Sequence, residues 1–128
     1  MKQIALKLGI AVLAVFAPAQ NIMLACMTLI SCDLVSGVLA ARKRKETITS
    51  SGFKRTLVKL VVYELAIALG FIAQHYLMGD VIPVINIIGS YVGLTELTSA
   101  YENINEIAGE NLLKNVLDKL NSSSKEKE

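Results

Sequence analysis

The sequence of 128 residues has no tryptophan, only two prolines, two cysteines and one histidine, and charged residues make up just 19% of it. Two cysteines are too few for the disulfide framework of a small secreted domain. A net charge of +2 does not suggest a nucleic-acid-binding protein. Soluble domains carry charge on about a quarter of their residues, so the composition argues against a soluble enzyme. The hydrophobic content of 53% excludes disorder and favours a small membrane protein.

Long apolar segments dominate the chain, and they are interrupted by few charges. A helix needs about 20 residues to cross the hydrocarbon core of a bilayer. The segments at 22–41 and 56–78 reach that length, the segment at 81–100 reaches it with more polar residues, and the segment at 4–17 is short. The breaks at 17–21 and 79–83 are short, which predicts two antiparallel hairpins, with Pro83 in the first turn of the last segment. We therefore predict an all-α integral membrane protein whose transmembrane domain, residues 1–100, has four spans at about 4–17, 22–41, 56–78 and 81–100.

Basic residues collect on one side of this predicted topology. Neither hairpin tip contains lysine or arginine, whereas the termini and the loop between the second and third segments are rich in both. The positive-inside rule then predicts a multi-pass protein of the cytoplasmic membrane, with both termini in the cytoplasm. The basic cytoplasmic loop contains Arg42, Lys43, Arg44, Lys45, Lys54 and Arg55.

The N-terminus has a second interpretation. Lys2, Lys7 and the Ala-Pro-Ala at 17–19 are similar to a secretory signal with a cleavage site, and cleavage would leave three spans. Because another apolar run follows almost at once, we favour a retained hairpin. A lipoprotein signal at 24–26 is less favoured, since the polar break at 18–21 interrupts its apolar run.

Asp33, Lys59, Glu64 and Glu96 are ionisable residues that fall well inside the predicted spans. A charge at the bilayer centre costs about 2.5–3.5 kcal/mol on insertion scales. Asp33 and Glu64 both lie about 12 Å below the cytoplasmic end of their segments, and Lys59 has the reach to contact either. The carboxyls are either buried and neutral while Lys59 extends to the headgroups, or they line a polar helix contact or an aqueous path. We favour the second interpretation.

Small residues recur at spacings of four within three of the predicted spans. This spacing places them on one helix face, where they permit close helix packing in lipid and hence oligomerisation. Asp33 shares such a face with Gly37, one turn along. The pairs are Ser36 with Ala40, Gly37 with Ala41, Ala66 with Gly70, and Gly89 with Gly93.

The sequence offers no visible catalytic machinery, and we predict no enzymatic activity, cofactor or metal site. His75 lacks neighbouring ligands at metal-binding spacing and is interpreted as an interfacial anchor beside Tyr76. Cys26 and Cys32 lie six residues apart, about 120° from facing each other on a helix, so they are not expected to pair.

The region after the last predicted span is more polar. Residues 101–121 follow the helical spacing of an amphipathic cytoplasmic helix, with a break near Gly109, that lies on the membrane or packs against its copies. Residues 122–128 are low in complexity and predict a disordered tail.

Two motifs resemble a known family. The run Asp33-Leu-Val-Ser36-Gly37-Val-Leu-Ala40 before the basic loop is similar to a signature of the bacteriophage holin family, which includes toxin-secretion and phage-lysis holins. The Ser-rich turn at 49–52 and Lys59 resemble the family's next features, a serine-rich turn and the basic start of the following helix. The spaced residues Glu96, Ser99, Glu102 and Asn103 are similar to the family's second signature, at the cytoplasmic end of the last span. The chain departs from the family after this motif, where Gly109 and the residues after it replace a proline-containing turn that is common in the family.

The resemblance implies a function that spacing alone does not. Holins accumulate in the membrane and form homo-oligomeric lesions, which release an endolysin or other proteins without needing direct contact with them. The implied partners are the lipid bilayer, further copies of the chain and, functionally, an endolysin. The alternatives are a subunit of a small transporter or channel, and a structural membrane-docking protein.

Overall fold

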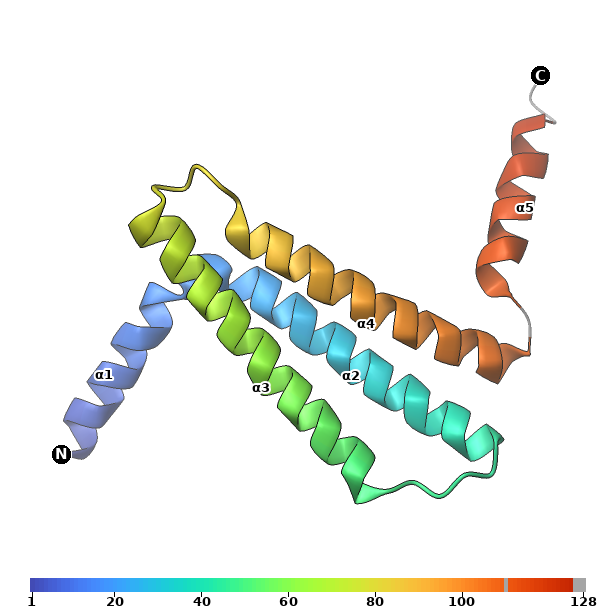
Figure 1. Cartoon of the computed structure of the whole chain (residues 1–128), viewed down its shortest axis with the longest axis horizontal. Coiled ribbons are helices and arrows are strands. Elements are labelled where there is room, and N and C mark those ends of the chain that lie inside the picture. The colour runs from blue at the N-terminus through green and yellow to red at the C-terminus, as the bar shows by residue number, and fades with distance from the viewer. Residues whose placement is uncertain (110, 126–128) are drawn as a thin grey trace.

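A computed structural model describes residues 1–109 and 111–125, and it is all-α over those residues (Figure 1). It contains five α-helices, a short 3-10 helix before the second and a π-helical turn after the third. In chain order the elements are α1 (Lys2–Val15), η1 (Ala17–Ala19), α2 (Gln20–Lys43), α3 (Ser50–Ile72), η2 (Ala73–Leu77), α4 (Val84–Ala108) and α5 (Leu112–Lys125).

The three long helices form a bundle, while α1 and α5 leave it at opposite ends (Figure 1). Helices α2 and α4 run parallel and make the most extensive contact, and α3 runs antiparallel to both. The core is narrow and apolar at the end where the chain enters α2; it includes Cys26, Ile67, Phe71 and Val92. Large apolar side chains on the outer face of the bundle are exposed, as in a protein whose solvent is lipid. Two stretches, Ala17–Lys43 and Ser50–Leu77, are long and apolar enough to cross a membrane.

The predicted first hairpin is not present. The 3-10 helix at Ala17–Ala19 turns the chain sharply from α1 into α2 without packing the two helices together, and α1 projects from the bundle with none of its residues buried (Figure 1). The reason is local. Pro18 fits the first turn of the 3-10 helix, where its missing N–H is harmless, and the amides Gln20 and Asn21 continue as the first turn of α2.

The second predicted reversal does occur, between α3 and α4. The π-helical turn closes α3, and Gly79 and Asp80 then both adopt left-handed backbone angles, with φ of 58° and 60°. Glycine adopts this conformation without steric cost. The fourth segment begins later than predicted, because Pro83 is the N-cap of α4 and does not lie in its first turn.

Helix α4 extends past residue 100, where the predicted span ends, and stops at the predicted break near Gly109. Helix α4 continues to Ala108, because no residue from 101 to 108 breaks a helix, and it ends where Gly109 adopts φ of 72°. Residues 101–121 are therefore two elements, the last two turns of α4 and most of α5. Helix α5 runs on to Lys125, four residues into the predicted tail, and 126–128 lie outside the described residues.

Candidate functional site

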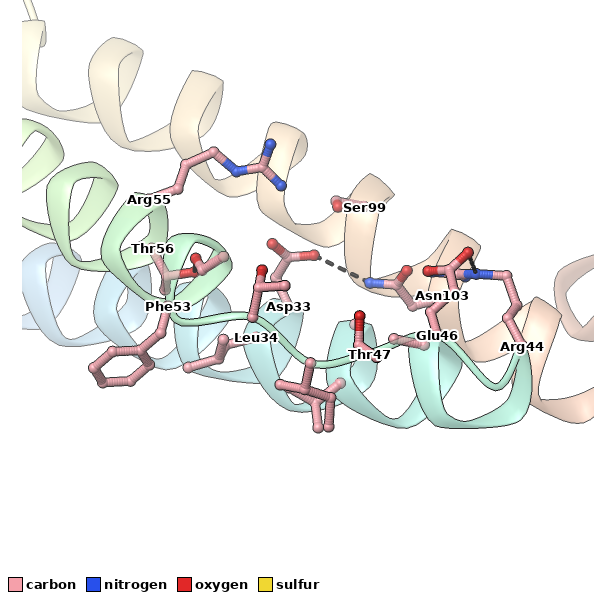
Figure 2. A pocket seen from close by; sticks show the side chains of 16 residues that line it. Asp33, Leu34, Arg44, Glu46, Thr47, Phe53, Arg55, Thr56, Ser99 and Asn103 are labelled. Atoms are coloured by element: carbon pink, nitrogen blue, oxygen red, sulfur yellow. Dashed lines mark hydrogen bonds and ion pairs between the residues drawn. The ribbon is translucent and has the colours of Figure 1, made fainter.

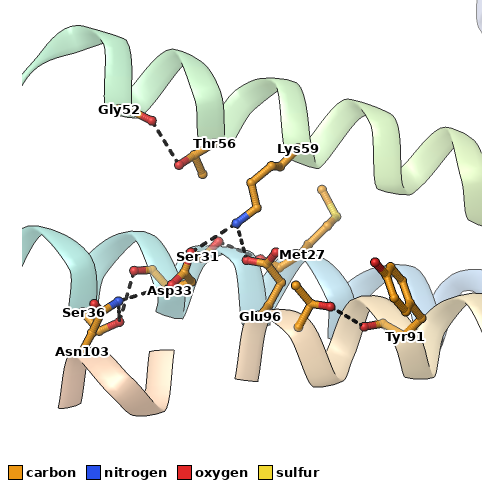
Figure 3. Close-up of polar contacts among 11 residues, drawn as sticks. Met27, Ser31, Asp33, Ser36, Gly52, Thr56, Lys59, Tyr91, Glu96 and Asn103 are labelled. Carbon is orange, nitrogen blue, oxygen red and sulfur yellow. Dashed lines mark hydrogen bonds and ion pairs between the residues drawn. The ribbon is translucent and has the colours of Figure 1, made fainter. Parts of the chain in front are cut away.

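A buried ionic cluster joins all three helices of the bundle (Figure 3). Lys59 on α3 extends its ammonium group between α2 and α4. Its Nζ lies 2.7 Å from Oε2 of Glu96 on α4 and 3.3 Å from Oδ2 of Asp33 on α2. The Glu96 side chain is fully buried, and that of Asp33 is only 15% exposed. One lysine therefore connects two carboxylates that belong to different helices.

A hydrogen-bonded extension of the cluster runs toward the α2–α3 loop. The amide Nδ2 of Asn103 on α4 donates to Oδ1 of Asp33 at 3.3 Å and to Oγ of Ser36 at 3.2 Å. Ser36 Oγ donates in turn to the backbone carbonyl of Asp33 at 3.1 Å. Both carboxylate oxygens of Asp33 thus have partners. A Cβ added at Gly37 would lie 3.5 Å from the Asn103 amide, so this glycine makes room for it.

The cluster contains more carboxylate than cation. Glu64 lies on α3 one turn beyond Lys59, and both of its carboxylate oxygens are buried without a hydrogen-bond partner among the described residues. Oε1 of Glu96 is in the same state. Burying a carboxylate without partners costs free energy, because its hydration is lost and nothing replaces it. The bundle therefore has a polar interior that is only partly satisfied.

Basic residues at the end of α2 hold the end of α4. Lys43 Nζ donates to the backbone carbonyls of Glu106 at 2.7 Å and Ile107 at 3.0 Å, which are among the last carbonyls of the helix. Arg44 Nη1 lies 2.6 Å from Oε2 of Glu106. Arg44 also pairs with Glu46 through two hydrogen bonds of 2.9 Å, which raise the pKa of Arg44 and lower that of Glu46.

A hollow of about 480 Å³ lies under the α2–α3 loop, at the same end of the bundle (Figure 2). Asp33 and Asn103 line its inner wall, and Arg44, Arg55 and Ser99 lie around it. The hollow leads from the loop to the Asp33 end of the ionic cluster. Asp33 is therefore the member of the cluster that borders this hollow.

The structure brings some of the predicted site residues together and leaves others apart. Asp33, Ser36, Lys59 and Glu96 meet in the cluster, and Asn103 of the second motif joins them. Others make no hydrogen bond within the cluster: the Glu64 carboxylate has no hydrogen-bond partner among the described residues, and Ala40 is buried. The exposed residues are Arg42 at the end of α2, Lys45 in the α2–α3 loop, Lys54 on α3 and Glu102 on α4.

The glycines that we expected to pack closely differ in how tightly they do so. A Cβ at Gly93 would make ordinary contact with Leu29 at 3.6 Å, whereas one at Gly89 would lie 2.7 Å from Ile22. The tightest position is Gly70, where a Cβ would lie 2.6 Å from Ile88.

Sequence reasoning missed the principal partner of Lys59. It considered Asp33 and Glu64, because those two residues share a depth, but the shortest contact is to Glu96. A signal was present. Glu96 and Asn103 lie seven residues apart, so they share a face of α4, and that face also had to meet the polar face of α2.

The α3–α4 turn forms a smaller polar group. His75 Nδ1 lies 2.9 Å from Oδ2 of Asp80, Gln74 Nε2 donates to the other Asp80 oxygen at 3.2 Å, and the His75 ring stacks on Phe71. These contacts, that of Gln74 first, lower the pKa of Asp80. The His75 ring also makes an edge contact with the ring of Tyr76, and its contact with Asp80 helps to hold the turn.

A family model described as the bacteriophage holin family matches residues 10–122. The chain belongs to this holin family. No curated protein and no solved structure matches it. Holins of this family are non-enzymatic membrane pore formers, and membership implies a function in phage lysis. The resemblance seen in the two sequence motifs is therefore confirmed, and the match includes every residue of the ionic cluster.

Proposed function

We propose that the protein oligomerises in the cytoplasmic membrane of its host and forms lesions through which an endolysin, or another protein without an export signal, leaves the cytoplasm. The observation that carries this proposal is the Lys59 cluster, a buried ionic contact among three helices of a membrane pore former. The lesion itself supplies the route, so the endolysin needs no direct contact with the holin.

The cluster has the chemistry of an element that is stable in two arrangements. In the closed bundle, Lys59 satisfies one oxygen each of Asp33 and Glu96, while Glu64 and the second Glu96 oxygen stay unsatisfied. In an assembly whose helices part around water, hydration would satisfy all of these groups. The desolvation cost of these groups in the closed bundle then favours the open assembly, where they are hydrated. A packed interior with two such arrangements can act as a switch.

The topology that we propose has the basic loop and the end of α4 on the cytoplasmic side, with α2, α3 and α4 as spans. Residues 2–19 provide the fourth and shortest span: the 14 residues of α1 give about 21 Å at 1.5 Å each, and the three 3-10 residues add about 6 Å. Since α1 diverges from α2, this span crosses beside the bundle and does not pack along it. Both termini are then cytoplasmic.

Induced expression in a bacterial host, with and without an endolysin, tests the function. We expect membrane potential to collapse abruptly in both cultures, and lysis to follow only where the endolysin is present. Loss of potential with no endolysin-dependent lysis would instead indicate an ion channel. Absence of both at high levels of inserted protein would contradict the proposal.

The role of the cluster is tested in the same cells with Asp33→Asn. This change keeps size and hydrogen bonding but removes the charge paired with Lys59, so we expect a shifted onset of permeabilisation at an unchanged level of inserted protein. Glu102→Gln, an equal charge change at an exposed position of α4, is the matched control. If the two variants share the onset of the parent, the cluster does not set it.

A further inference from the structure

Helix α5 has an apolar face that the described part of the chain leaves uncovered. Val116, Leu117 and Leu120 each have half or more of their side chain exposed, and Leu112 stands at the start of the same face. At about 100° per residue, these four positions cover an arc of about 140°, so the apolar face is narrow and continuous.

The charged residues of α5 lie beside this apolar face or opposite to it. By the same helical spacing, Lys114 and Lys119 lie beyond the two edges of the apolar face, and Asp118 lies on the opposite side of the helix. All three side chains are exposed. Two lysines that flank an apolar strip, with the acid turned away, match a surface that is hydrocarbon in the middle and anionic at the level of the flanking ammonium groups.

The position and direction of α5 are fixed by the end of α4. Tyr101 Oη donates to Oδ1 of Asn111 at 2.8 Å, and the backbone N–H of Leu112 donates to Oδ1 of Asn105 at 3.2 Å. With Gly109 in the left-handed conformation, the chain turns sharply, and α5 runs across the direction of the bundle (Figure 1). If the long helices cross the membrane, α5 starts at its surface and extends along it.

We propose that α5 is an interfacial helix, which lies on the cytoplasmic surface of the membrane with Leu112, Val116, Leu117 and Leu120 inserted among the lipids. A second copy of α5 is a poorer occupant of this face. The strip is short, and two copies would place lysines of like charge at both borders of the contact. The proposal depends on the membrane location of the bundle but not on lesion formation.

Depth measurement on the full-length protein tests the proposal. In a Cys26→Ala, Cys32→Ser background, single cysteines at Val116 and at Asp118 carry an environment-sensitive fluorophore, and the protein is reconstituted into phosphatidylethanolamine and phosphatidylglycerol vesicles. The two positions lie half a turn apart, so they report opposite faces of one helix. Lipids with a nitroxide on the upper acyl chain act as the quencher.

We expect the label at 116 to emit at shorter wavelength and to lose most of its emission to the quenching lipid, because an interfacial helix buries its apolar face about 5–10 Å deep. The label at 118 should keep an aqueous emission in the same vesicles. Adding Leu120→Glu should return the label at 116 to the aqueous signal, whereas Ser122→Glu should not.

Two results would overturn the proposal. One is equal and weak quenching at 116 and 118, which would leave α5 in water. The other is a label at 116 that is shielded only as the protein density in the vesicles rises and that stays insensitive to the quenching lipid, which would assign the face to a second copy. Neither result bears on whether the protein forms lesions.

Discussion

Replacing Lys59 by methionine should destabilise the bundle through charge and not through packing. Methionine keeps the length and the apolar stem of lysine but removes the ammonium group that lies 2.7 Å from Glu96 and 3.3 Å from Asp33. Glu96 is the more severely affected partner, because its side chain is fully buried, whereas Asp33 retains the hydrogen bond from Asn103.

The size of the effect can be worked out from these distances. At an effective dielectric constant of about 20, the two attractions are worth about 6 and 5 kcal/mol before desolvation is subtracted. Removing one partner of a buried pair costs about 3–5 kcal/mol. Protonation of the carboxylate that is left behind limits this loss of stability, because the orphaned charge can cost no more than the free energy needed to protonate it. For an ordinary glutamate, protonation costs about 4 kcal/mol at pH 7 and about 1 kcal/mol at pH 5. We therefore expect a loss of about 3–4 kcal/mol at pH 7 that shrinks to about 1 kcal/mol at pH 5.

The free energy of unfolding can be measured by titrating dodecyl sulfate into mixed micelles and following helix content by circular dichroism. Lys54→Met, the same change at an exposed residue of α3, is the control and should stay within about 0.5 kcal/mol of the parent. Adding Glu96→Gln to Lys59→Met should recover at least about 1 kcal/mol at pH 7, because it removes the unpaired buried charge.

Two results would refute this reasoning. If Lys59→Met matches Lys54→Met at pH 7, the ionic contacts do not stabilise the bundle. If the loss is as large at pH 5 as at pH 7, the cause is altered packing, since an orphaned carboxylate must become less costly as protons become available.

Three further predictions concern other parts of the fold. Gly89→Ala should cost about 1–3 kcal/mol in the same unfolding assay, because its Cβ would lie 2.7 Å from an α2 side chain, whereas Gly9→Ala, in open space, should be neutral or raise helix content. Lys43→Met should speed backbone hydrogen exchange in the last turn of α4 while Lys54→Met does not, because only Lys43 donates to carbonyls there. The lowered pKa of Asp80 stabilises the 78–83 turn above its ordinary pKa, and this is lost as pH falls through the native value. Exchange in the turn should therefore rise only below about pH 4, and Asp80→Asn should abolish that dependence.

The features that could be predicted from the sequence are those that depend on local pattern. Apolar length predicted α2 and α3, the Gly79-Asp80 pair predicted the reversal after α3, and the cost of a charge in lipid predicted that Asp33 would be turned toward protein. These features are set by short stretches of chain together with the solvent around them.

The predictions that failed depended on how helices meet. The first hairpin was inferred from a proline and two amides, but those residues fit a 3-10 turn that leaves α1 and α2 apart as well as a reversal that packs them together. Likewise Glu96 was recognised as a charge without a partner, because its partner lies 37 residues away on another helix. The rise in polarity at 101 did not reveal that residues 101–108 continue α4, although the break near Gly109 was predicted correctly.

The ionic cluster is a poor way to stabilise a membrane bundle, and that bears on why the chain has it. Apolar side chains of similar volume in place of Asp33, Lys59 and Glu96 would avoid the desolvation of three charges, and such replacements often leave a protein as stable or more so. A bundle stabilised in that way would have an interior that matches lipid and would gain nothing by admitting water. With the cluster present, the closed state includes a carboxylate at Glu64 that only solvent or a proton satisfies, so opening is compensated by hydration. In the open assembly that we propose, the same residues that weaken the closed bundle would provide a water-compatible surface, and lesion formation would need both properties.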